Sequence, residues 1–245
     1  MIRTRKSGIG LLVKAGLVGL TFSIVSANSM AQRGSMAESG KPAAHAGQQP
    51  INNLPNPYVT ERNFGSLPDG RSWGSVSAIN VDIDGVHIWA GDRCGTNQCA
   101  TTPDINPIVK LDPNGRVVAQ FGAGQILWPH GMDVDHEGSV WVADARVAND
   151  NEISQNPAAA NIGSAVMKFS PDGDLLMTIG TPGEVGDPPT HLTEPNDVLI
   201  APNGRIFIAE THQAQFQGEP SDETKSRITM WEPDGTYIGH FGEYG

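Results

Sequence analysis

Five side chains of this chain combine reactive groups with positions beside apolar stretches. His130 begins one apolar stretch, Arg93 lies just past the end of another, and His212 follows a third in a polar loop. A neutral imidazole is a good zinc ligand, and zinc acidifies a bound hydroxyl. A guanidinium presents a planar fork that suits a carboxylate. Cys94 and Cys99, the only cysteines, flank the loop after Arg93 and would stiffen it if they were bonded.

These side chains must be positioned by a repeated architecture. Three Pro-Asx-Gly turns, at 112–115, 170–173 and 232–235, lie 58 and 62 residues apart. Each follows one extended apolar stretch and precedes another. A fixed period of this size indicates a solenoid, propeller or array. Short β-rich runs between glycine turns predict an all-β fold, a partial β-propeller of about three blades at 76–124, 127–183 and 192–245.

Each blade is expected to contain four strands in hairpin order. The expected strands are 78–82, 86–90, 107–111 and 116–122, then 130–135, 140–145, 165–170 and 174–180, then 196–201, 205–210, 227–231 and 236–242. A short lead-in strand is expected within 58–75. The polar stretches 146–163 and 211–226 are expected to be long loops.

The hairpin order predicts which residues meet. In an up-and-down blade, the start of the first strand and the end of the second lie at the same end of the sheet. His130 and Asn196 begin first strands, whereas Arg93 and Glu210 lie at or after the ends of second strands. We therefore expect them on one face, near the central channel. Ordinary packing of His130 and a surface ion pair for Arg93 are the alternatives.

The N-terminal part is expected to lie outside the propeller, which we place at 58–245. Four basic residues precede or flank a short apolar run at 15–25, which favours a secretory signal peptide at 1–31 and a periplasmic or extracellular protein. A retained anchor is the alternative. Residues 32–57 are rich in Gly, Ala, Gln, Ser and Pro and are expected to be a disordered linker.

Charge and cysteine spacing limit the partners. Removing 1–31 leaves 12 of the 16 basic residues against all 27 acidic residues, a net charge of −15. This disfavours nucleic acid and, after signal removal, anionic membranes as partners. In an exported chain, Cys94 and Cys99 are expected to form a local disulfide, with a metal pair as the alternative.

Several phrases of the chain resemble one family. Residues 128–135 (WPHGMDVD), 194–198 (EPNDV) and 92–95 (DRCG) are similar to phrases of the NHL-repeat propellers, which are typically six-bladed. Within them they resemble the bacterial proteins similar to peptidyl-α-hydroxyglycine α-amidating lyase. The resemblance covers about 73–245.

The resemblance implies a lyase, if the chain is active, that uses zinc and calcium. In that family three histidines bind zinc, an arginine binds the substrate carboxylate, and a tyrosine helps to take the hydroxyl proton before the carbon–nitrogen bond breaks. His130 matches a zinc ligand and Arg93 the arginine, while the carbonyls of Met132 and Ile79 match calcium ligands. The tyrosine position falls near Thr211 or His212, so His212 is the candidate base.

Three functions therefore remain open. The first is a secreted amidating-type lyase that releases glyoxylate and a peptide amide. The second is a non-catalytic propeller that binds a peptide or small molecule at the channel mouth. The third is a calcium-dependent hydrolase, because residues 195–198 (PNDV) also resemble the gluconolactonase ligand motif, with Asn196 and Glu210 as oxygen ligands. An open blade edge also predicts self-association.

Overall fold

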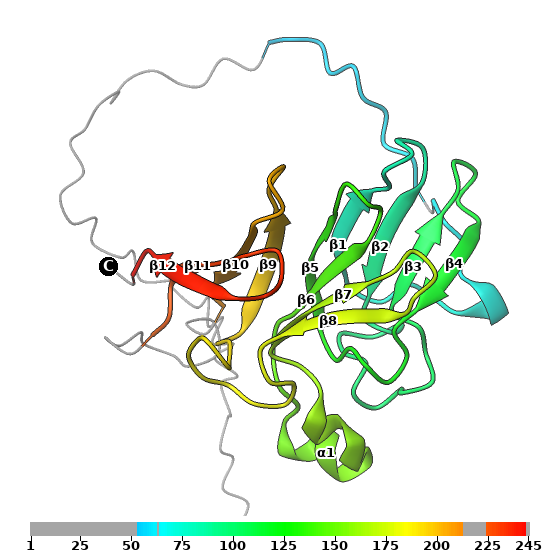
Figure 1. The fold of residues 1–245 in the computed structure, drawn as a ribbon. Helices are drawn as coiled ribbons and strands as arrows, with labels where there is room; N and C mark the ends of the chain where they lie inside the picture. Colours follow the sequence, from blue (N-terminus) through cyan, green and yellow to red (C-terminus); the bar gives the residue numbers. More distant parts are fainter. Residues whose placement is uncertain (1–52, 63, 213–223, 244–245) are drawn as a thin grey trace, which may run out of the picture. The chain divides into compact units, whose positions relative to one another are not determined.

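The computed structural model of this chain describes residues 53–62, 64–212 and 224–243. Contacts divide the chain into two compact units, 1–57 and 58–245. Within the second unit, three four-stranded antiparallel sheets follow one another along the chain (Figure 1). The expected signal peptide lies outside the described residues, as does the expected linker apart from 53–57.

Every sheet is an up-and-down meander. The first contains β1 (Val76–Val81), β2 (Ile88–Asp92), β3 (Ile108–Leu111) and β4 (Val117–Phe121). The second contains β5 (Pro129–Val134), β6 (Val140–Asp144), β7 (Ala165–Phe169) and β8 (Leu175–Ile179). The third contains β9 (Pro195–Ile200), β10 (Ile206–Glu210), β11 (Arg227–Trp231) and β12 (Tyr237–Phe241). The expected all-β, partial-propeller fold is confirmed, and each of these strands begins and ends within two residues of its expected bounds.

The Pro-Asx-Gly turns join the third and fourth strands of each sheet. Their glycines, at 115, 173 and 235, have φ values of +73°, +95° and +83°, which favour glycine. In the first turn, the Asp112 carboxylate accepts hydrogen bonds from the backbone N–H groups of Asn114 and Arg116. Local turn chemistry therefore fixes these hairpins.

The first strands of successive sheets contact one another, β1 with β5 and β5 with β9, so they are the innermost strands. Two apolar cores lie between the sheets, one around Trp89 and Phe169 and the other around Trp141 and Trp231. The inner strands approach so closely at Gly131 that a Cβ atom there would meet Asp197. The three sheets are therefore packed blades rather than separate hairpins.

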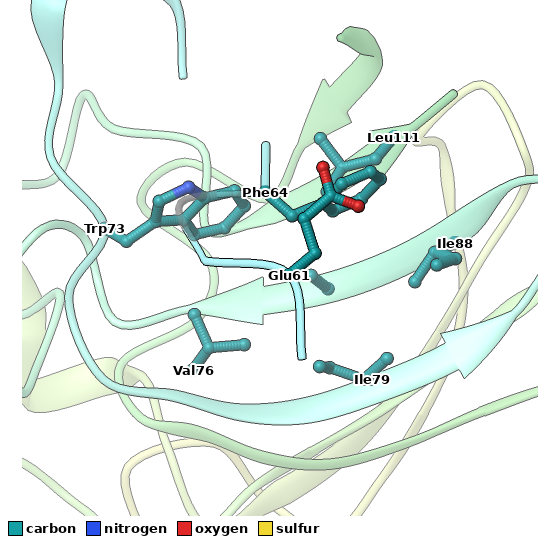
Figure 2. A pocket seen from close by; sticks show the side chains of 8 residues that line it. Glu61, Phe64, Trp73, Val76, Ile79, Ile88 and Leu111 are labelled. Carbon is teal, nitrogen blue, oxygen red and sulfur yellow. The ribbon is translucent and has the colours of Figure 1, made fainter. Parts of the chain in front are cut away.

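The segment 64–75 is not a strand. Ser66 forms only an isolated bridge with Arg116, and residues Pro68–Gly70 form a 3-10 turn, because Pro68 and two glycines with positive φ interrupt the extended backbone. Leu67 packs on the outer face of the first blade. Figure 2 shows Trp73 beside the apolar side chains of β1 and β2 in a pocket of about 460 Å³.

The expected loop 146–163 contains two helical elements, α1 (Asp150–Gln155) and η2 (Pro157–Asn161). A reciprocal capping box between Asn149 and Glu152 begins α1. Arg146 binds the buried Glu152 carboxylate with two hydrogen bonds of 2.8 and 2.7 Å. The helix is too short for an apolar period, which explains why the sequence pattern indicated a loop.

The outer face of the third blade is apolar and exposed. Leu199 is 56% exposed, and it lines a shallow pocket of about 120 Å³ with Phe207, Ala209 and Ile228. The described part of the chain contains no helix that is long and apolar enough to cross a membrane.

Candidate functional site

One buried acid ends the second strand of each blade. Asp92, Asp144 and Glu210 are all fully buried. They pair in register with Val76, Pro129 and Pro195, which begin the first strands. The expected meeting of first-strand starts with second-strand ends is therefore confirmed.

These acids fasten the segment that leads into each first strand. Asp92 accepts a hydrogen bond of 2.6 Å from the backbone N–H of Gly74, and Asp144 one of 2.8 Å from that of Leu127. Glu210 accepts one of 2.7 Å from Thr193. Burial raises the pKa of Asp144 to about 7, although its backbone hydrogen bonds oppose this. The acids therefore position the residues that follow.

Glu210 and Asn196, the alternative calcium ligands, have other partners. The Glu210 carboxylate forms a 3.0 Å ion pair with the guanidinium of Arg227. The Asn196 Oδ1 accepts hydrogen bonds from the backbone N–H and the hydroxyl of Thr211. The structure does not bring the Glu210 carboxylate into the pocket that Asn196 lines.

Arg93 is a buried cation at this end of the blades. It donates hydrogen bonds to the Pro129 carbonyl at 3.1 Å, to Asn97 at 2.7 Å and to the Ser77 hydroxyl at 3.1 Å. Its guanidinium lies 3.7 Å from the centroid of the Trp128 indole. Burial and the nearby Arg146 lower its pKa to about 10, so it stays charged at neutral pH.

Every partner of Arg93 given above is neutral. No carboxylate among the described residues lies within ion-pair distance of this guanidinium. A buried cation without an ion pair is costly, and an anionic ligand would compensate it. This environment differs from the surface ion pair that was the alternative for Arg93.

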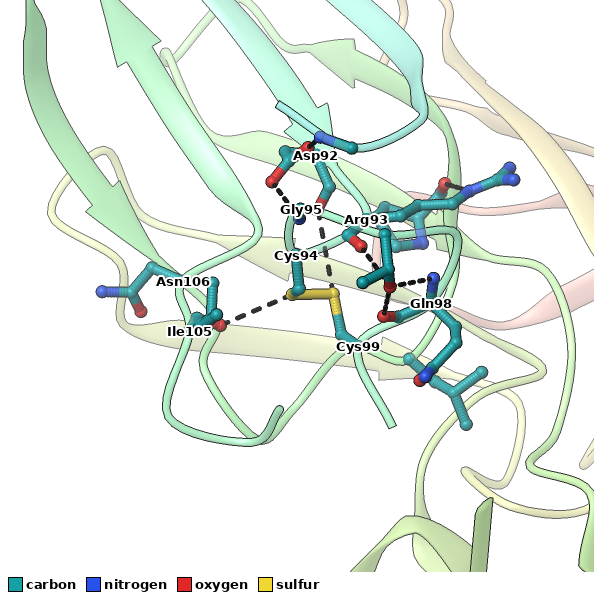
Figure 3. The surroundings of a disulfide bond; sticks show 12 residues. Asp92, Arg93, Cys94, Gly95, Gln98, Cys99, Ile105 and Asn106 are labelled. Carbon is teal, nitrogen blue, oxygen red and sulfur yellow. Dashed lines mark hydrogen bonds between the residues drawn. A yellow bond between two sulfur atoms is a disulfide. The ribbon is translucent and has the colours of Figure 1, made fainter. Parts of the chain in front are cut away.

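The loop after Arg93 is closed by the expected disulfide. Cys94 and Cys99 are bonded, with their Cα atoms 5.2 Å apart. Figure 3 shows the bond close to Asp92 and Ile105, whose carbonyl oxygens each lie 3.8 Å from a sulfur atom. The disulfide thus stiffens the loop that begins at Arg93, as the cysteine spacing predicted.

His130 has a defined tautomer. Its Nδ1 lies 2.7 Å from the Asn196 carbonyl oxygen, which can only accept, so Nδ1 carries the proton and Nε2 has a lone pair. Burial is the main cause that lowers the pKa of His130, and the charge of Arg93 adds to it. At neutral pH the ring is therefore a base or a ligand through Nε2.

His212 and Trp128 complete an aromatic cluster. The His130 and His212 ring centroids lie 4.7 Å apart, and they lie 5.4 and 5.2 Å from that of Trp128. Burial lowers the pKa of His212, and the charges of His130 and Arg93 lower it further. The structure therefore brings Arg93, His130 and His212 together around one indole ring.

The expected calcium-binding positions line one pocket. Ile79, Met132, His130 and Asn196 surround a cavity of about 370 Å³ between the inner strands. Asp197 lines the same cavity, and burial together with the charge of Asp133 raises the pKa of its carboxyl group. The Met132 carbonyl accepts a 3.3 Å hydrogen bond from the Asn80 amide.

The described residues do not complete a zinc site. Nowhere in 53–62, 64–212 and 224–243 do three His, Cys, Asp or Glu side chains lie where they could bind one metal ion together. His130 and His212 supply at most two imidazole ligands, whereas zinc normally takes three or four protein ligands. No reaction step can be derived through zinc from these residues.

Sequence reasoning missed two members of the site. Trp128 was recognised only as part of a repeated phrase, although its position just before Pro129 and His130 places it at the start of an inner strand. Asp197 is the residue after Asn196 and is the only acid among the described residues lining the inner-strand pocket. Both are neighbours in the sequence of His130 and Asn196, which were expected to begin first strands.

No family model matches this chain. It is 26% identical over 180 residues to a probable peptidyl-α-hydroxyglycine α-amidating lyase of Caenorhabditis elegans, which covers 66% of the chain and 47% of the relative. It is 25% identical over 185 residues to the rat peptidylglycine α-amidating monooxygenase, over 69% of the chain and 16% of the relative. A human NHL repeat-containing protein is 25% identical over 133 residues, 47% of the chain and 35% of that protein.

The matched segments span less than half the length of these relatives, so the activity of the whole relatives is not transferred with them. The three four-stranded blades agree with the resemblance seen in the sequence motifs. So do the two kinds of relative, the amidating lyases and the NHL repeat-containing protein. The chain forms part of a β-propeller and resembles the NHL-repeat propellers and, among them, the peptidyl-α-hydroxyglycine α-amidating lyases.

Proposed function

We propose that the chain takes part in carbon–nitrogen cleavage of a peptidyl-α-hydroxyglycine, which yields a peptide amide and glyoxylate. The observation that carries the proposal is the buried guanidinium of Arg93. It has no ion pair among the described residues and lies on Trp128 beside two histidines. Asp144 acts on it only from beyond ion-pair distance, and a substrate with a terminal carboxylate would supply an anion in direct contact.

The proposed reaction needs a carboxylate anchor and a base. Arg93 binds the substrate carboxylate and thereby orients the α-carbon. His212 accepts the proton of the α-hydroxyl group, and the electron pair of that O–H bond forms the carbonyl of glyoxylate. The carbon–nitrogen bond breaks, its electron pair goes to the amide nitrogen, and the nitrogen takes up a proton.

The electrostatics support His212 as the base. Burial, His130 and Arg93 all lower its pKa, so the ring is neutral at pH 7. A neutral imidazole can accept a proton, and histidine is the side chain that most often acts as a general base. His130 points one nitrogen at the Asn196 carbonyl and has its other nitrogen for a ligand.

Zinc and calcium remain proposals for this chain. His130 would contribute one nitrogen to zinc, and the carbonyls of Ile79 and Met132 would contribute oxygens to calcium, with Asp197 beside them. Zinc would acidify the substrate hydroxyl, and calcium would stiffen the inner strands. The steps above use only the chain's own residues.

We also propose an oxidising compartment, the periplasm or the cell exterior. The Cys94–Cys99 disulfide is compatible with it, because such bonds persist where thiols are not kept reduced. The ligand is a peptide or another small molecule with a carboxylate, bound at the end of the blades where Arg93 lies.

The test is release of glyoxylate from N-acetyl-tyrosyl-α-hydroxyglycine by the full chain, with zinc and calcium added and with both chelated. We expect release above the uncatalysed rate. Arg93→Ala and His212→Ala are expected to reduce it at least tenfold, while Arg205→Ala, which removes an exposed ion pair, should not. Equal rates with and without the protein at full metal loading would contradict the lyase.

The second candidate is a propeller that binds carboxylates without catalysis. It is favoured by the incomplete set of zinc ligands among the described residues. Carboxylate binding that depends on Arg93, without glyoxylate release, would identify it. The lactonase alternative is less favoured, because Glu210 is paired with Arg227 and Asn196 binds Thr211.

A further inference from the structure

A second cavity, here called the side pocket, is lined by Trp128 and is separate from the cavity that His130 lines. It has a volume of about 470 Å³, and Asn97, Trp128, Arg146, Asn149 and Glu194 line it. Trp128 thus contributes to this pocket and also contacts Arg93, His130 and His212. The same indole ring therefore borders the side pocket and contacts the Arg93 guanidinium.

Glu194 is the unusual residue of the side pocket. Its Oε2 is buried and has no hydrogen-bond partner among the described residues. Buried polar atoms are almost always hydrogen-bonded, so an exception calls for an explanation such as a missing ligand. The pKa of the Glu194 carboxyl is raised by burial, which agrees with an incompletely compensated group.

The backbone at Glu194 is strained as well. Its φ is +49°, in the left-handed region that is unfavourable for a residue with a Cβ atom. Thr193, bound to the buried Glu210, fixes the chain on one side, and Pro195 begins β9 on the other. Such strain is often found at ligand sites, where a side chain must point in one direction.

The nearby cation does not neutralise Glu194. Arg146 lowers its pKa only in part, because the Arg146 guanidinium already makes two hydrogen bonds with Glu152. A ligand that donates an N–H to Glu194 would satisfy the carboxylate, whereas an anionic group there would be repelled. The remaining walls are two amide side chains, the indole, and the apolar residues Val147 and Ala148, a mixture that suits a peptide.

We propose that the side pocket binds the peptide part of the substrate, with Glu194 accepting a hydrogen bond from the backbone N–H of the residue that precedes the C-terminal carboxylate-bearing unit. This rests on the proposed function, because it places the carboxylate at Arg93. Trp128 would then contact the side chain of that preceding residue. The side pocket would make the chain prefer peptides to simple N-acyl acids.

The experiment measures dissociation constants by calorimetry with the full chain. The probes are acetyl-Ala-Tyr-Gly, which carries the C-terminal carboxylate, and the same peptide with an N-methyl group on the tyrosine nitrogen. The variants are Glu194→Gly, Glu194→Gln and, as a matched control, Glu137→Gln, an exposed glutamate that is paired with Lys168 at the other end of the second blade.

We expect N-methylation to weaken binding to the wild-type chain about tenfold, as for one hydrogen bond to a charged acceptor. Glu194→Gly should weaken binding of the unmethylated peptide about tenfold and lose the discrimination. Glu194→Gln should retain part of the discrimination between the two peptides, and Glu137→Gln should retain all of it. Because glycine accepts a positive φ, Glu194→Gly should unfold at a denaturant concentration no lower than the wild type.

The proposal is overturned if the wild-type chain binds both peptides equally, binds neither, or if Glu194→Gly still discriminates between them. The proposed lyase is tested separately by glyoxylate release. If Glu194 discriminates between the two peptides but no glyoxylate is released, the side-pocket proposal is supported and the lyase proposal is contradicted. If glyoxylate is released but the two peptides bind equally, the lyase proposal is supported and the side-pocket proposal is contradicted.

Discussion

The guanidinium of Arg93 lies 3.7 Å from the centroid of the Trp128 indole and donates to the carbonyl of Pro129. This stack joins the loop after β2 to the segment that begins β5, so it connects the first two blades at the end where both histidines lie. The indole fixes the plane of the guanidinium. Arg93, a residue of the first blade, therefore determines where an anion can bind beside the second blade.

Arg93→Lys is expected to weaken carboxylate binding about tenfold. Lysine keeps the charge but loses the planar fork and the stacking on Trp128, which together orient a carboxylate. The measurement is the dissociation constant of acetylglycine. The matched control is Arg205→Lys at an exposed ion pair, which should bind as the wild type does. Unchanged affinity in Arg93→Lys would exclude bidentate recognition.

The two histidines are expected to titrate below pH 6.5. Burial is the main cause of the lowered pKa in both rings. The charge of Arg93 lowers both pKa values further, and that of His130 lowers the pKa of His212. At pH values between the folded-state pKa and the unfolded-state pKa of about 6.5, the unfolded chain binds more protons than the folded chain. The stability that the neutral rings contribute is therefore lost as the pH falls from about 6.5 through the folded-state pKa. Proton NMR of the His130 and His212 rings measures both values, and a pKa above 6.5 in either ring would contradict the arrangement.

Asp144→Asn is expected to change the pH dependence of stability. The pKa of the Asp144 carboxyl rises on folding from 3.8 to about 7, so between these pH values the folded state binds a proton that the unfolded state has lost. The stability that this group contributes to the wild type therefore falls as the pH rises from about 4 to 7. The amide does not titrate. It accepts the Leu127 and Trp128 N–H groups less well, so the variant is less stable at pH 4, by about 1–3 kcal/mol. The deficit should shrink at pH 7; urea unfolding at both values tests this.

The fold was predictable because its determinants are local. Gly115, Gly173 and Gly235 define hairpins by turn chemistry, and the apolar runs around them repeat with a nearly constant period. The helix Asp150–Gln155 was missed because six residues show no apolar period, and its partner Arg146 lies outside it. Its capping box at Asn149 was nevertheless visible in the sequence.

The site was predictable in part. His130 and Asn196 were both expected to begin first strands, and the hairpin order placed Arg93 at the same end of the blades. The role of Trp128 depends on three segments meeting in space, so no local pattern contained it. The ion pair of Glu210 with Arg227 was accessible from the register of the expected hairpin, where the two residues face each other.

Loss of the Cys94–Cys99 disulfide is expected to weaken both binding and folding. A loop this small contributes about 2 kcal/mol in the chain-entropy description, less than a long loop would. Replacing both cysteines with serine frees the loop that positions Arg93, so acetylglycine should bind severalfold more weakly. Thermal unfolding and calorimetry measure the two effects. Full affinity in the double variant would show that the Trp128 stack suffices to orient Arg93.

The outer face of the third blade is expected to promote self-association. Leu199 is 56% exposed beside Phe207 and Ile228, and an apolar blade face in water tends to pair with another surface. Leu199→Lys adds a charge that association would have to bury, so the sedimentation coefficient should become independent of concentration. Leu176→Lys on the second blade is the matched control, because Leu176 is equally exposed at 56% but lies on the outermost strand β8. If both variants changed sedimentation alike, general surface charge rather than this face would control association.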